Sequence, residues 1–484
     1  MTDTTQDQHT PQPVIDTAEP PVDIPEWALK RVDTSDGAPP LEEQWERYRK
    51  MGAGGRFWGR TLSAIKLGPP YVPAADQMKV FWLVGIAIMV NHYDIGIFGL
   101  ALPRIQESLA ISDGEVGMLA AYMRLGILPG LFLALFADRM GRRKLLMLTI
   151  LGTATFTFLT AFATTKETFV ALQFLARACA YTEDILCFVV VVEVMDPKLR
   201  GWAIGALGAL GAAGHGLAAG VYANIEIIPY DWRGLYMLGV GPMLLLAWLR
   251  RGLDETDRFK NQQDRREEQA QGGKLLAAFK PLVSVVTAYP GRMIAICAVI
   301  APFAFGAGAA LWFVPKYLQT ELGWSVGAAS TMYIVGGTLA VAGNFLAGRL
   351  SDQVGRKSIL ITGLLVSAVG MGLFYSGIDG WLVVVVWVTA QFAFFCAEVT
   401  LSALGGELFP TSYRSTASSV RAIVSSLAAV AGLLTQSALY AMTGDFGLAT
   451  AIPLALIPLS AIIAWFAIPE TATKTLEDIS PEVD

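Results

Sequence analysis

The chain has 484 residues, of which 54% are hydrophobic and only 16% are charged, and its mean hydropathy of +0.49 is too high for a soluble enzyme. The formal net charge is −5 and the basic residues lie in short loops rather than on one face, so the sequence excludes a nucleic-acid partner. Apolar stretches recur between residues 79 and 468, and each has the roughly 18 residues or more that a helix needs to cross a bilayer core of about 30 Å. The composition therefore predicts a membrane protein.

Residues 1–78 precede the first apolar stretch and are predicted to form a cytoplasmic N-terminal tail without a signal peptide. Residues 1–41 are rich in Pro, Thr, Asp and Gln, which predicts disorder. Residues 42–66 interleave aromatic and aliphatic side chains with Arg and Lys, which predicts a basic amphipathic segment on the membrane surface against anionic lipid. A solvated basic linker is the alternative interpretation of this segment.

The apolar pattern predicts an all-α membrane protein with twelve transmembrane helices in two pseudo-symmetric six-helix halves. The expected spans are 79–103, 114–137, 145–164, 168–195, 201–223, 233–251, 292–315, 324–347, 358–377, 381–403, 416–440 and 447–468. They divide the chain into an N-terminal bundle (79–251), a cytoplasmic linker (252–291), a C-terminal bundle (292–468) and a cytoplasmic C-terminal tail (469–484).

The Lys and Arg residues of the short loops gather on one side of this arrangement. They include Arg142, Arg200, Arg356 and the basic residues that begin with Arg250 at the linker, whereas the other side has few, among them Lys316. By the positive-inside rule the basic side is cytoplasmic, and both termini lie there.

One loop motif occurs in both halves. Asp138-Arg-Met-Gly-Arg142 follows the second expected span, and Asp352-Gln-Val-Gly-Arg356 follows the eighth. A second motif, which runs from Glu193 to Arg200, recurs at the same offset from Glu407 to Arg414. A constant offset across two motifs indicates a duplicated chain, with parallel repeats about an axis along the membrane normal.

These motifs resemble the signature of the major facilitator superfamily. The Glu-to-Arg elements and the Pro469-Glu-Thr tail are similar to the sugar-porter and metabolite:proton symporter branches, although Ala134 and the segment Arg177-Ala-Cys-Ala stand where glycines are usual in those branches. The resemblance implies the fold of that superfamily, secondary transport by alternating access and coupling to protons.

The charged residues of the repeated motifs are predicted to form a conformational gate at the cytoplasmic face. They are Asp138, Arg142, Glu193, Arg200, Asp352, Arg356, Glu407 and Arg414. A network of several charges is more stable than an isolated surface ion pair, which contributes at most ~1 kcal/mol. The alternative is that these residues only determine topology.

Ionisable side chains inside the spans are the candidates for function, because each costs several kcal/mol unless it is paired or hydrated. Asp94, Arg124 and Arg177 fall at similar depths and are expected to form one cluster. Asp184 lies two turns from Arg177, and Glu398 is its counterpart in the second half. A carboxylate beside an arginine can take up and release a proton as its access to water changes, so Asp94, Asp184 and Glu398 are the candidate proton-coupling residues. A permanent structural pair of Asp94 and Arg177 is the alternative.

The candidate substrate-binding residues are Arg124, Arg177, Gln391, Trp312 and Asn344. The two arginines suit bidentate binding of a substrate carboxylate, and the other three are expected to line the C-terminal half of a cavity. We interpret His215 as an interhelical histidine with its hydrogen bonds satisfied rather than as a proton relay. Arg421, near the start of span 11, is expected to snorkel to the interface.

We therefore expect a secondary active transporter that takes up a small organic anion, such as a carboxylate, together with protons. A sugar or polyol symporter and a proton-antiporting exporter of drugs or cations are the alternatives, and a sensor that binds without transport is a third. The sequence has no nucleotide loop, metal cluster or nucleophile motif, so we expect neither an enzyme nor a cofactor. The expected partners are the small solute, protons and the lipid bilayer of the inner or plasma membrane, and the chain is expected to act as a monomer.

Overall fold

The computed structural model describes residues 71–134, 140–252, 280–410 and 413–472, with the single residues 43, 46, 47, 69 and 479. The side chains of a few helical residues, among them Asn344 and Asp352, are not part of this description. Asp138, most of the 1–78 tail and most of the 252–291 linker lie outside the described residues, so the predictions for them stay predictions.

The described chain is all-helical, which confirms the expected fold class. Its main helices are α3 (Ala75–Leu109), α4 (Asp113–Arg124), α5 (Ile127–Ala134), α7 (Arg142–Thr160), α8 (Lys166–Val194), α9 (Arg200–Tyr222), α10 (Trp232–Leu249), α12 (Lys280–Ala288), α13 (Pro290–Trp312), α14 (Val314–Thr320), α15 (Val326–Val354), α16 (Arg356–Phe374), α17 (Trp381–Glu407), α18 (Arg414–Thr443), α19 (Phe446–Ala451) and α20 (Ile457–Ala467). Each expected span coincides with one of these helices or with a consecutive pair.

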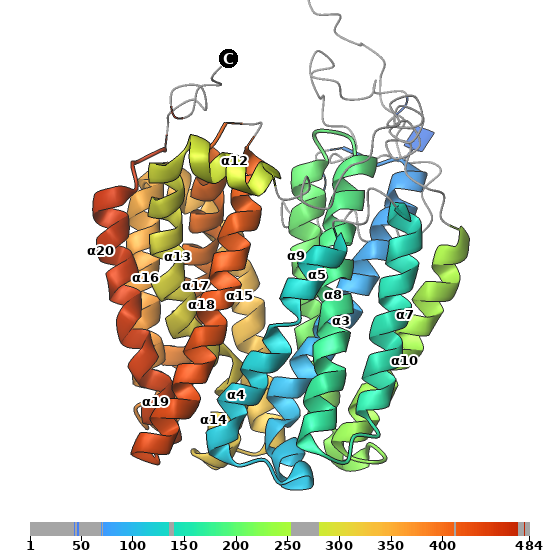
Figure 1. Cartoon of the computed structure of the whole chain (residues 1–484), viewed down its shortest axis with the longest axis vertical. Helices are drawn as coiled ribbons and strands as arrows, with labels where there is room; N and C mark the ends of the chain where they lie inside the picture. Colours follow the sequence, from blue (N-terminus) through green and yellow to red (C-terminus); the bar gives the residue numbers. More distant parts are fainter. Residues whose placement is uncertain are drawn as a thin grey trace, which may run out of the picture. The chain divides into compact units, whose positions relative to one another are not determined.

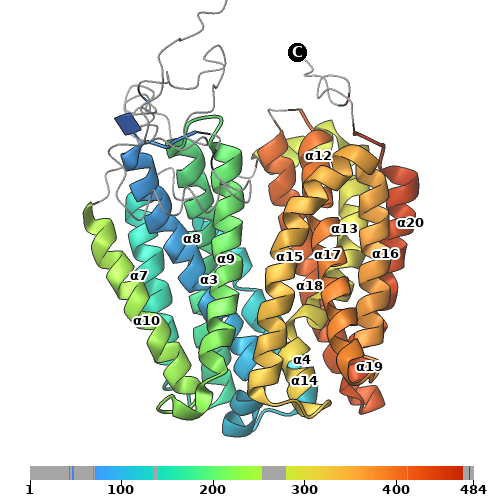
Figure 2. The same cartoon turned by 180° about the vertical axis from the view of Figure 1, so that it is seen from behind.

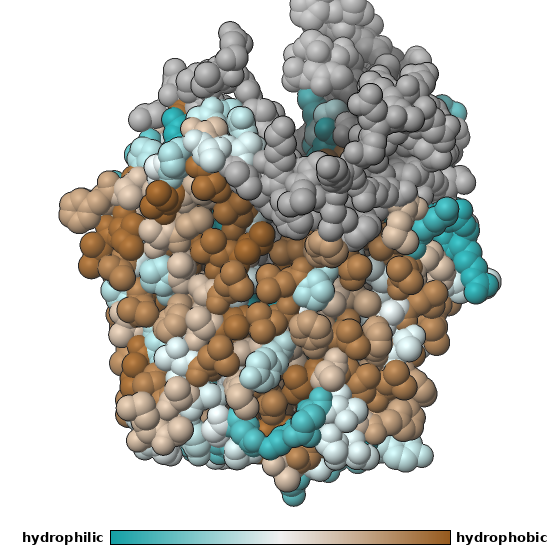
Figure 3. Space-filling view, in the orientation of Figure 1, coloured by the Kyte–Doolittle hydropathy of each residue, from teal (hydrophilic) through white to brown (hydrophobic). Residues whose placement is uncertain are grey.

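Within the described residues, nine helical segments are long and apolar enough to cross a membrane. α7, α8 and α15 coincide with expected spans but are not among the nine, so the number twelve stays a prediction. Large apolar side chains are exposed on the outer surface, including Phe466 (82%) and Trp248 (61%). Figure 3 shows such side chains over most of the described surface in that view, as a bilayer requires.

Residue contacts divide the chain into one unit of residues 1–82 with 194–205 and a second unit of residues 83–193 with 206–484. In the first unit, Asp196 accepts hydrogen bonds from Gln77 at 2.9 Å and from Tyr71 at 3.3 Å. The second unit contains most of both expected halves and the cavity described below. Figures 1 and 2 show α13, α15, α16, α17, α18 and α20 bundled together in the C-terminal half.

The repeated loop motif has the same backbone conformation in both halves. Gly141 precedes α7 with φ of 92°, and Gly355 precedes α16 with φ of 108°. Residues with a Cβ rarely adopt this conformation, which explains why the motif has glycine at both positions. In each half, the glycine lets the chain turn directly into a helix that begins with arginine.

Candidate functional site

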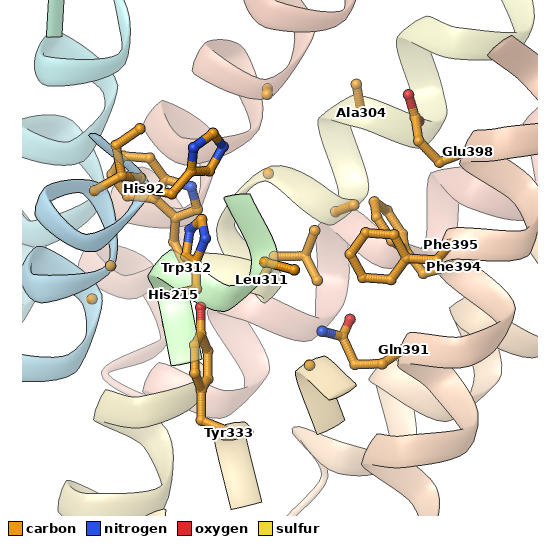
Figure 4. A pocket seen from close by; sticks show the side chains of 18 of the residues that line it. His92, His215, Ala304, Leu311, Trp312, Tyr333, Gln391, Phe394, Phe395 and Glu398 are labelled. Carbon is orange, nitrogen blue, oxygen red and sulfur yellow. The ribbon is translucent and has the colours of Figure 1, made fainter. Parts of the chain in front are cut away.

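A cavity of about 490 Å³ lies between the helices of the two halves, within the second contact unit. α3, α4 and α9 form its wall in the first half, and α13, α15, α17 and α18 form its wall in the second half. The polar and aromatic residues that line it include His92, Arg124, His215, Trp312, Tyr333, Gln391, Phe394, Phe395 and Glu398. Figure 4 shows the two histidines on one side and Gln391 and Glu398 on the other.

The ring of Trp312 lies close to two guanidinium groups. The Cζ atoms of Arg124 and Arg177 are each 5.9 Å from the ring centroid. The buried Nε of Arg124, and Nε and Nη1 of Arg177, have no hydrogen-bond partner among the described residues. Arg177 does reach Gln173, through Nη2 at 3.4 Å. A cation–π contact contributes about 0.5–2 kcal/mol, which does not replace the hydrogen bonds to water that these guanidinium groups lose on burial. Their unpartnered N–H groups are therefore suited to bind an anion.

A break in the second expected span brings the two arginines together. Arg124 is the last residue of α4, and α5 begins at Ile127. A Cβ on Gly126 would lie 2.6 Å from the carbonyl oxygen of Phe174 and 3.0 Å from Cβ of Arg177. Only glycine permits this approach to α8. The expected span 114–137 corresponds to the membrane-capable segment Asp113–Ala134, whose helix is interrupted at this contact.

Asp94 lies in the helix packing of the first half and is only 1% exposed. Thr157 donates a hydrogen bond to its Oδ1 at 3.1 Å, and its Oδ2 has no partner among the described residues. Although both side chains are described, no ion pair joins Asp94 to Arg177. Asp94 and Arg177 do interact electrostatically, so the cluster and the alternative of a permanent structural pair both stay predictions.

The other two candidate carboxylates differ in position. Asp184 accepts a hydrogen bond from Asn91 at 3.1 Å and does not line the cavity. Glu398 lines the cavity and forms an ion pair with Arg421, with Nη1 and Oε1 3.2 Å apart. Arg421 thus has an acidic partner on the neighbouring helix that the sequence did not identify, and its snorkelling to the interface stays a prediction.

The remaining substrate-binding candidates lie in the second half. Gln391 and Trp312 line the cavity, and the buried Oε1 of Gln391 has no hydrogen-bond partner among the described residues. The side chain of Asn344 lies outside the described part of the chain.

Sequence reasoning missed a buried ion pair in the first half. Arg250, which the sequence placed with the basic linker residues, is 1% exposed and pairs with Glu183, which is fully buried. Thr149 donates a hydrogen bond to Glu183, and Nη2 of Arg250 donates to the carbonyl oxygen of Leu83 at 3.2 Å. The sequence counted Arg250 among the basic residues of the cytoplasmic side and did not identify its acidic partner inside the bundle.

The gate candidates form two equivalent ion pairs in the second contact unit. Arg142 pairs with Glu193 at 2.9 Å, and Arg356 pairs with Glu407. In each half, the arginine that starts a helix after the loop motif meets the glutamate of the second motif. The structure describes no side chain for Asp352 and does not describe Asp138.

The arginines of the second motif are not in these two pairs. Nε of Arg200 donates to the carbonyl oxygen of Met195 at 3.2 Å, within the first contact unit. The buried Nε of Arg414 has no hydrogen-bond partner among the described residues.

The Pro-Glu-Thr tail docks at the end of the second half where Arg356 pairs with Glu407. Oε1 of Glu470 accepts the backbone N–H of Arg356 at 2.9 Å, and Oε2 accepts that of Lys357 at 3.2 Å. The hydroxyl of Thr471 donates to Glu407 at 2.7 Å. Burial opposes the ionisation of Glu470, but backbone N–H donors, including those of Thr471 and Ala472, outweigh it and lower the pKa of this carboxyl.

We expect this docking to depend on pH. Because the pKa of Glu470 is lowered in the folded chain, its contribution to stability is present above the unfolded pKa and is lost as pH falls through the folded pKa. Hydrogen exchange of the first amides of α16, corrected for intrinsic rates, should accelerate over that range. Glu470→Gln should accelerate it about 10- to 100-fold at neutral pH, as the loss of a charge-assisted hydrogen bond of about 1.5–3 kcal/mol implies. Unchanged protection in Glu470→Gln, judged against the exposed control Glu321→Gln, would contradict the docking.

Polar contacts join the two halves at the opposite end of the helices. Lys316 of α14 is 2% exposed, and its Nζ lies 2.6 Å from Oδ1 of Asp113 at the start of α4. Gln106 also donates to Asp113, at 2.8 Å. The hydroxyl of Ser437 accepts the backbone N–H of Met118 at 2.8 Å. Figures 1 and 2 both show α4 and α14 side by side at this end. The sequence placed Lys316 on this side but did not identify its partner.

A multi-pass helical membrane protein with a central cavity between two halves that are tied together at one end belongs to the class of secondary transporters. The chain is a member of the Major Facilitator Superfamily, whose sequence profile matches residues 84–433 and 294–481. Its expected membership is thereby confirmed. It acts on small molecules in the membrane and is a transporter rather than an enzyme.

Curated relatives are similar to most of the chain. The cis,cis-muconate transport protein of Acinetobacter baylyi (strain ATCC 33305 / BD413 / ADP1) is 26% identical over 345 residues, which cover 70% of this chain and 81% of that protein. The shikimate transporter of Escherichia coli (strain K12) is 23% identical over 365 residues, which cover 67% and 79% respectively. Among solved structures, the inward open conformation of the xylose transporter XylE from E. coli is similar in fold, with a TM-score of 0.68 and 18% identity over 83% of this chain and 99% of that one.

Proposed function

We propose that the protein is a proton-coupled symporter that takes up a small organic acid by alternating access. The observation that carries this proposal is the pair of guanidinium groups at Trp312. Nε of both arginines and Nη1 of Arg177 lack acceptors among the described residues, and Arg124 lines the cavity. Such groups are matched to a carboxylate in charge and geometry. The relatives named for muconate and shikimate, both carboxylates, support the same substrate class.

In this proposal the basic end of the helices and both termini face the cytoplasm. The contacts between Lys316 and Asp113 then close the cavity on the outer side, while the paired motif residues act as the gate on the inner side. Asp94, Asp184 and Glu398 are the proposed carboxylates of proton coupling. A cation exporter is less well supported, because Arg124 lines the cavity and Glu398 already has Arg421 as its counter-ion.

Uptake into proteoliposomes tests this function. The purified chain would be given cis,cis-muconate, shikimate, nicotinate, xylose or tetraphenylphosphonium, with an imposed pH gradient that is acidic outside. We expect accumulation of at least one acid, abolished by a protonophore and independent of sodium. Accumulation of xylose alone would establish the sugar alternative, and expulsion of the cation would establish an exporter.

Asp94→Asn should abolish accumulation driven by the pH gradient but leave counterflow exchange of the acid intact, because the neutral side chain keeps the polar contact with Thr157 and cannot carry a proton. Asp379→Asn, at an exposed loop position, is the matched control. Unchanged accumulation in Asp94→Asn would remove Asp94 from the coupling mechanism.

Arg124→Gln should weaken binding of the acid about 10- to 100-fold, which corresponds to the loss of a charge-assisted hydrogen bond of about 1.5–3 kcal/mol. Arg124→Lys keeps the charge but loses the fork of N–H groups, so it should recover only part of the affinity. Binding would be measured by calorimetry on detergent-purified protein. Equal affinities in all three proteins would exclude Arg124 from the substrate site.

A further inference from the structure

Two of the three histidines of the chain face each other on the cavity wall. His92 of α3 and His215 of α9 have ring centroids 5.1 Å apart and ring planes at 63°. Both line the cavity, and Figure 4 shows them together on its first-half side. The third histidine, His9, lies in the N-terminal tail.

Each histidine packs on a glycine of the opposite helix. A Cβ on Gly211 would lie 3.2 Å from Cε1 of His92 and 3.3 Å from both ring nitrogens. A Cβ on Gly96 would lie 3.4 Å from Cδ2 of His215. Gly96 follows His92 by one helical turn, and Gly211 precedes His215 by one turn. Each ring thus packs against a glycine of the other helix, an arrangement called the reciprocal seat below, and this packing fixes the ring positions on the cavity wall.

The hydrogen bonds of the rings define their tautomers. Nδ1 of His92 lies 2.9 Å from the carbonyl oxygen of Ile88, and Nδ1 of His215 lies 3.3 Å from that of Gly211. A carbonyl oxygen only accepts hydrogen bonds, so Nδ1 carries the hydrogen in both rings. In the neutral pair both Nε2 atoms are therefore acceptors, and the structure shows no described residue that donates to either of them.

The two histidine rings have neighbouring charges of opposite sign. Asp184 of α8 interacts electrostatically with His92, whereas Arg177 of the same helix interacts with His215. A carboxylate is thus the charged neighbour of His92 and a guanidinium that of His215, and two imidazolium ions in contact repel each other. The pair therefore has room for one proton, and Asp184 is the counter-charge on the His92 side. The other titratable side chains that line the cavity are Arg124, Tyr333 and Glu398.

We propose that the His92–His215 pair is a one-proton site that binds the carboxylate of the solute, an inference that rests on the proposed function. A proton from water in the cavity adds to Nε2 of His92 and converts an acceptor into a charged N–H donor. The carboxylate of the solute accepts this hydrogen bond, so proton and anion bind together. When the cavity opens to the other side, the anion leaves and Nε2 returns its proton to water there.

Nitrogen NMR of the full-length chain in nanodiscs tests the proton site directly. With ¹⁵N-labelled histidine the chain contributes three imidazoles, and His9→Gln identifies the signals of the tail. We expect both cavity rings to carry hydrogen on Nδ1 at pH 8.5, and His92 alone to take up a proton on acidification to pH 5. Hydrogen on Nε2 of either ring at pH 8.5, two independent titrations or none would overturn the proposal.

The probe for the anion is benzoate, with the neutral benzamide as its matched control. At pH 5.5, benzoate should shift the Nε2 resonance of His92, and benzamide should leave it unchanged. No shift with benzoate, or equal shifts with both, would overturn the role of the pair in carboxylate binding. This result does not depend on transport, so a wild-type chain that accumulates no acid would refute the proposed function while the NMR experiment still decides about the histidines.

Variants provide a second measurement, the pH dependence of affinity in uptake of whichever acid the wild-type chain accumulates. His92→Gln keeps an N–H donor near the Nε2 position but cannot titrate, so the ratio of acid affinity at pH 5.5 to that at pH 7.5 should fall below the wild-type ratio. His92→Leu should lose about 10- to 100-fold in affinity at pH 5.5. A wild-type pH dependence in His92→Gln would overturn this inference and leave the proposed function intact.

The glycine seat offers a matched pair of substitutions on α9. Gly211→Ala places a methyl group against the His92 ring and should alter both the NMR titration and the pH dependence of uptake. Gly216→Ala meets no atom within 4 Å and should behave as wild type. Equal behaviour of the two variants would contradict the reciprocal seat.

Discussion

Glu183→Gln is expected to destabilise the folded protein by about 3–5 kcal/mol, because it leaves the guanidinium of Arg250 buried without a counter-charge. Both side chains of this ion pair are almost completely buried. The carboxylate also accepts the hydroxyl of Thr149, so the substitution disturbs a network rather than a single contact. Thermal and denaturant unfolding of the detergent-purified chain would measure the loss.

The double variant Glu183→Leu/Arg250→Met separates lost pairing from lost packing. It removes both charges and keeps apolar volume, so it should recover most of the stability that the single variant loses. Glu167→Gln changes an exposed carboxylate of the same helix and should stay within about 0.5 kcal/mol of wild type. A Glu183→Gln protein as stable as the Glu167→Gln control would contradict the buried pair.

Asp113→Asn is expected to shift the conformational equilibrium towards the state that is open at the end where Lys316 lies. The ammonium of Lys316 is buried where the two halves meet, so loss of its counter-ion should penalise this closed state by about 1–3 kcal/mol, less than for a fully buried pair because Asp113 is 36% exposed. A shift of that size changes the ratio of two states by about 5- to 150-fold.

Labelling of a cavity cysteine measures this shift. Gly337 lines the cavity, and a Cβ there would meet no atom within 4 Å, so Gly337→Cys in a chain without its native cysteines is a suitable reporter. A membrane-impermeant thiol reagent applied from the Lys316 side should label Asp113→Asn faster than the parent. Glu107→Gln, an exposed change near the same end, is the control. Equal labelling rates would show that the ion pair does not hold the closed state.

The sequence by itself determined the class of this protein. Long apolar stretches predict membrane helices because a helix satisfies all its backbone hydrogen bonds within one segment, which a bilayer demands. The repeated loop motif identified the superfamily, since its glycines and arginines serve a local turn and a helix start that recur in both halves. In the structure, Gly141 and Gly355 have the same positive-φ conformation ahead of the two helices.

Only the tertiary structure decided which of the ionisable residues meet. Arg250 pairs with Glu183, Arg421 with Glu398, and Lys316 with Asp113, and in each pair the partners lie on different helices. Depth is fixed by the rise along one helix, but contact depends on the rotation and tilt of two helices. Those are set by close approaches, such as Gly126 against α8 and Gly211 against His92. Small residues at such contacts govern how helices pack, and one sequence read along its length does not reveal which faces they bring together.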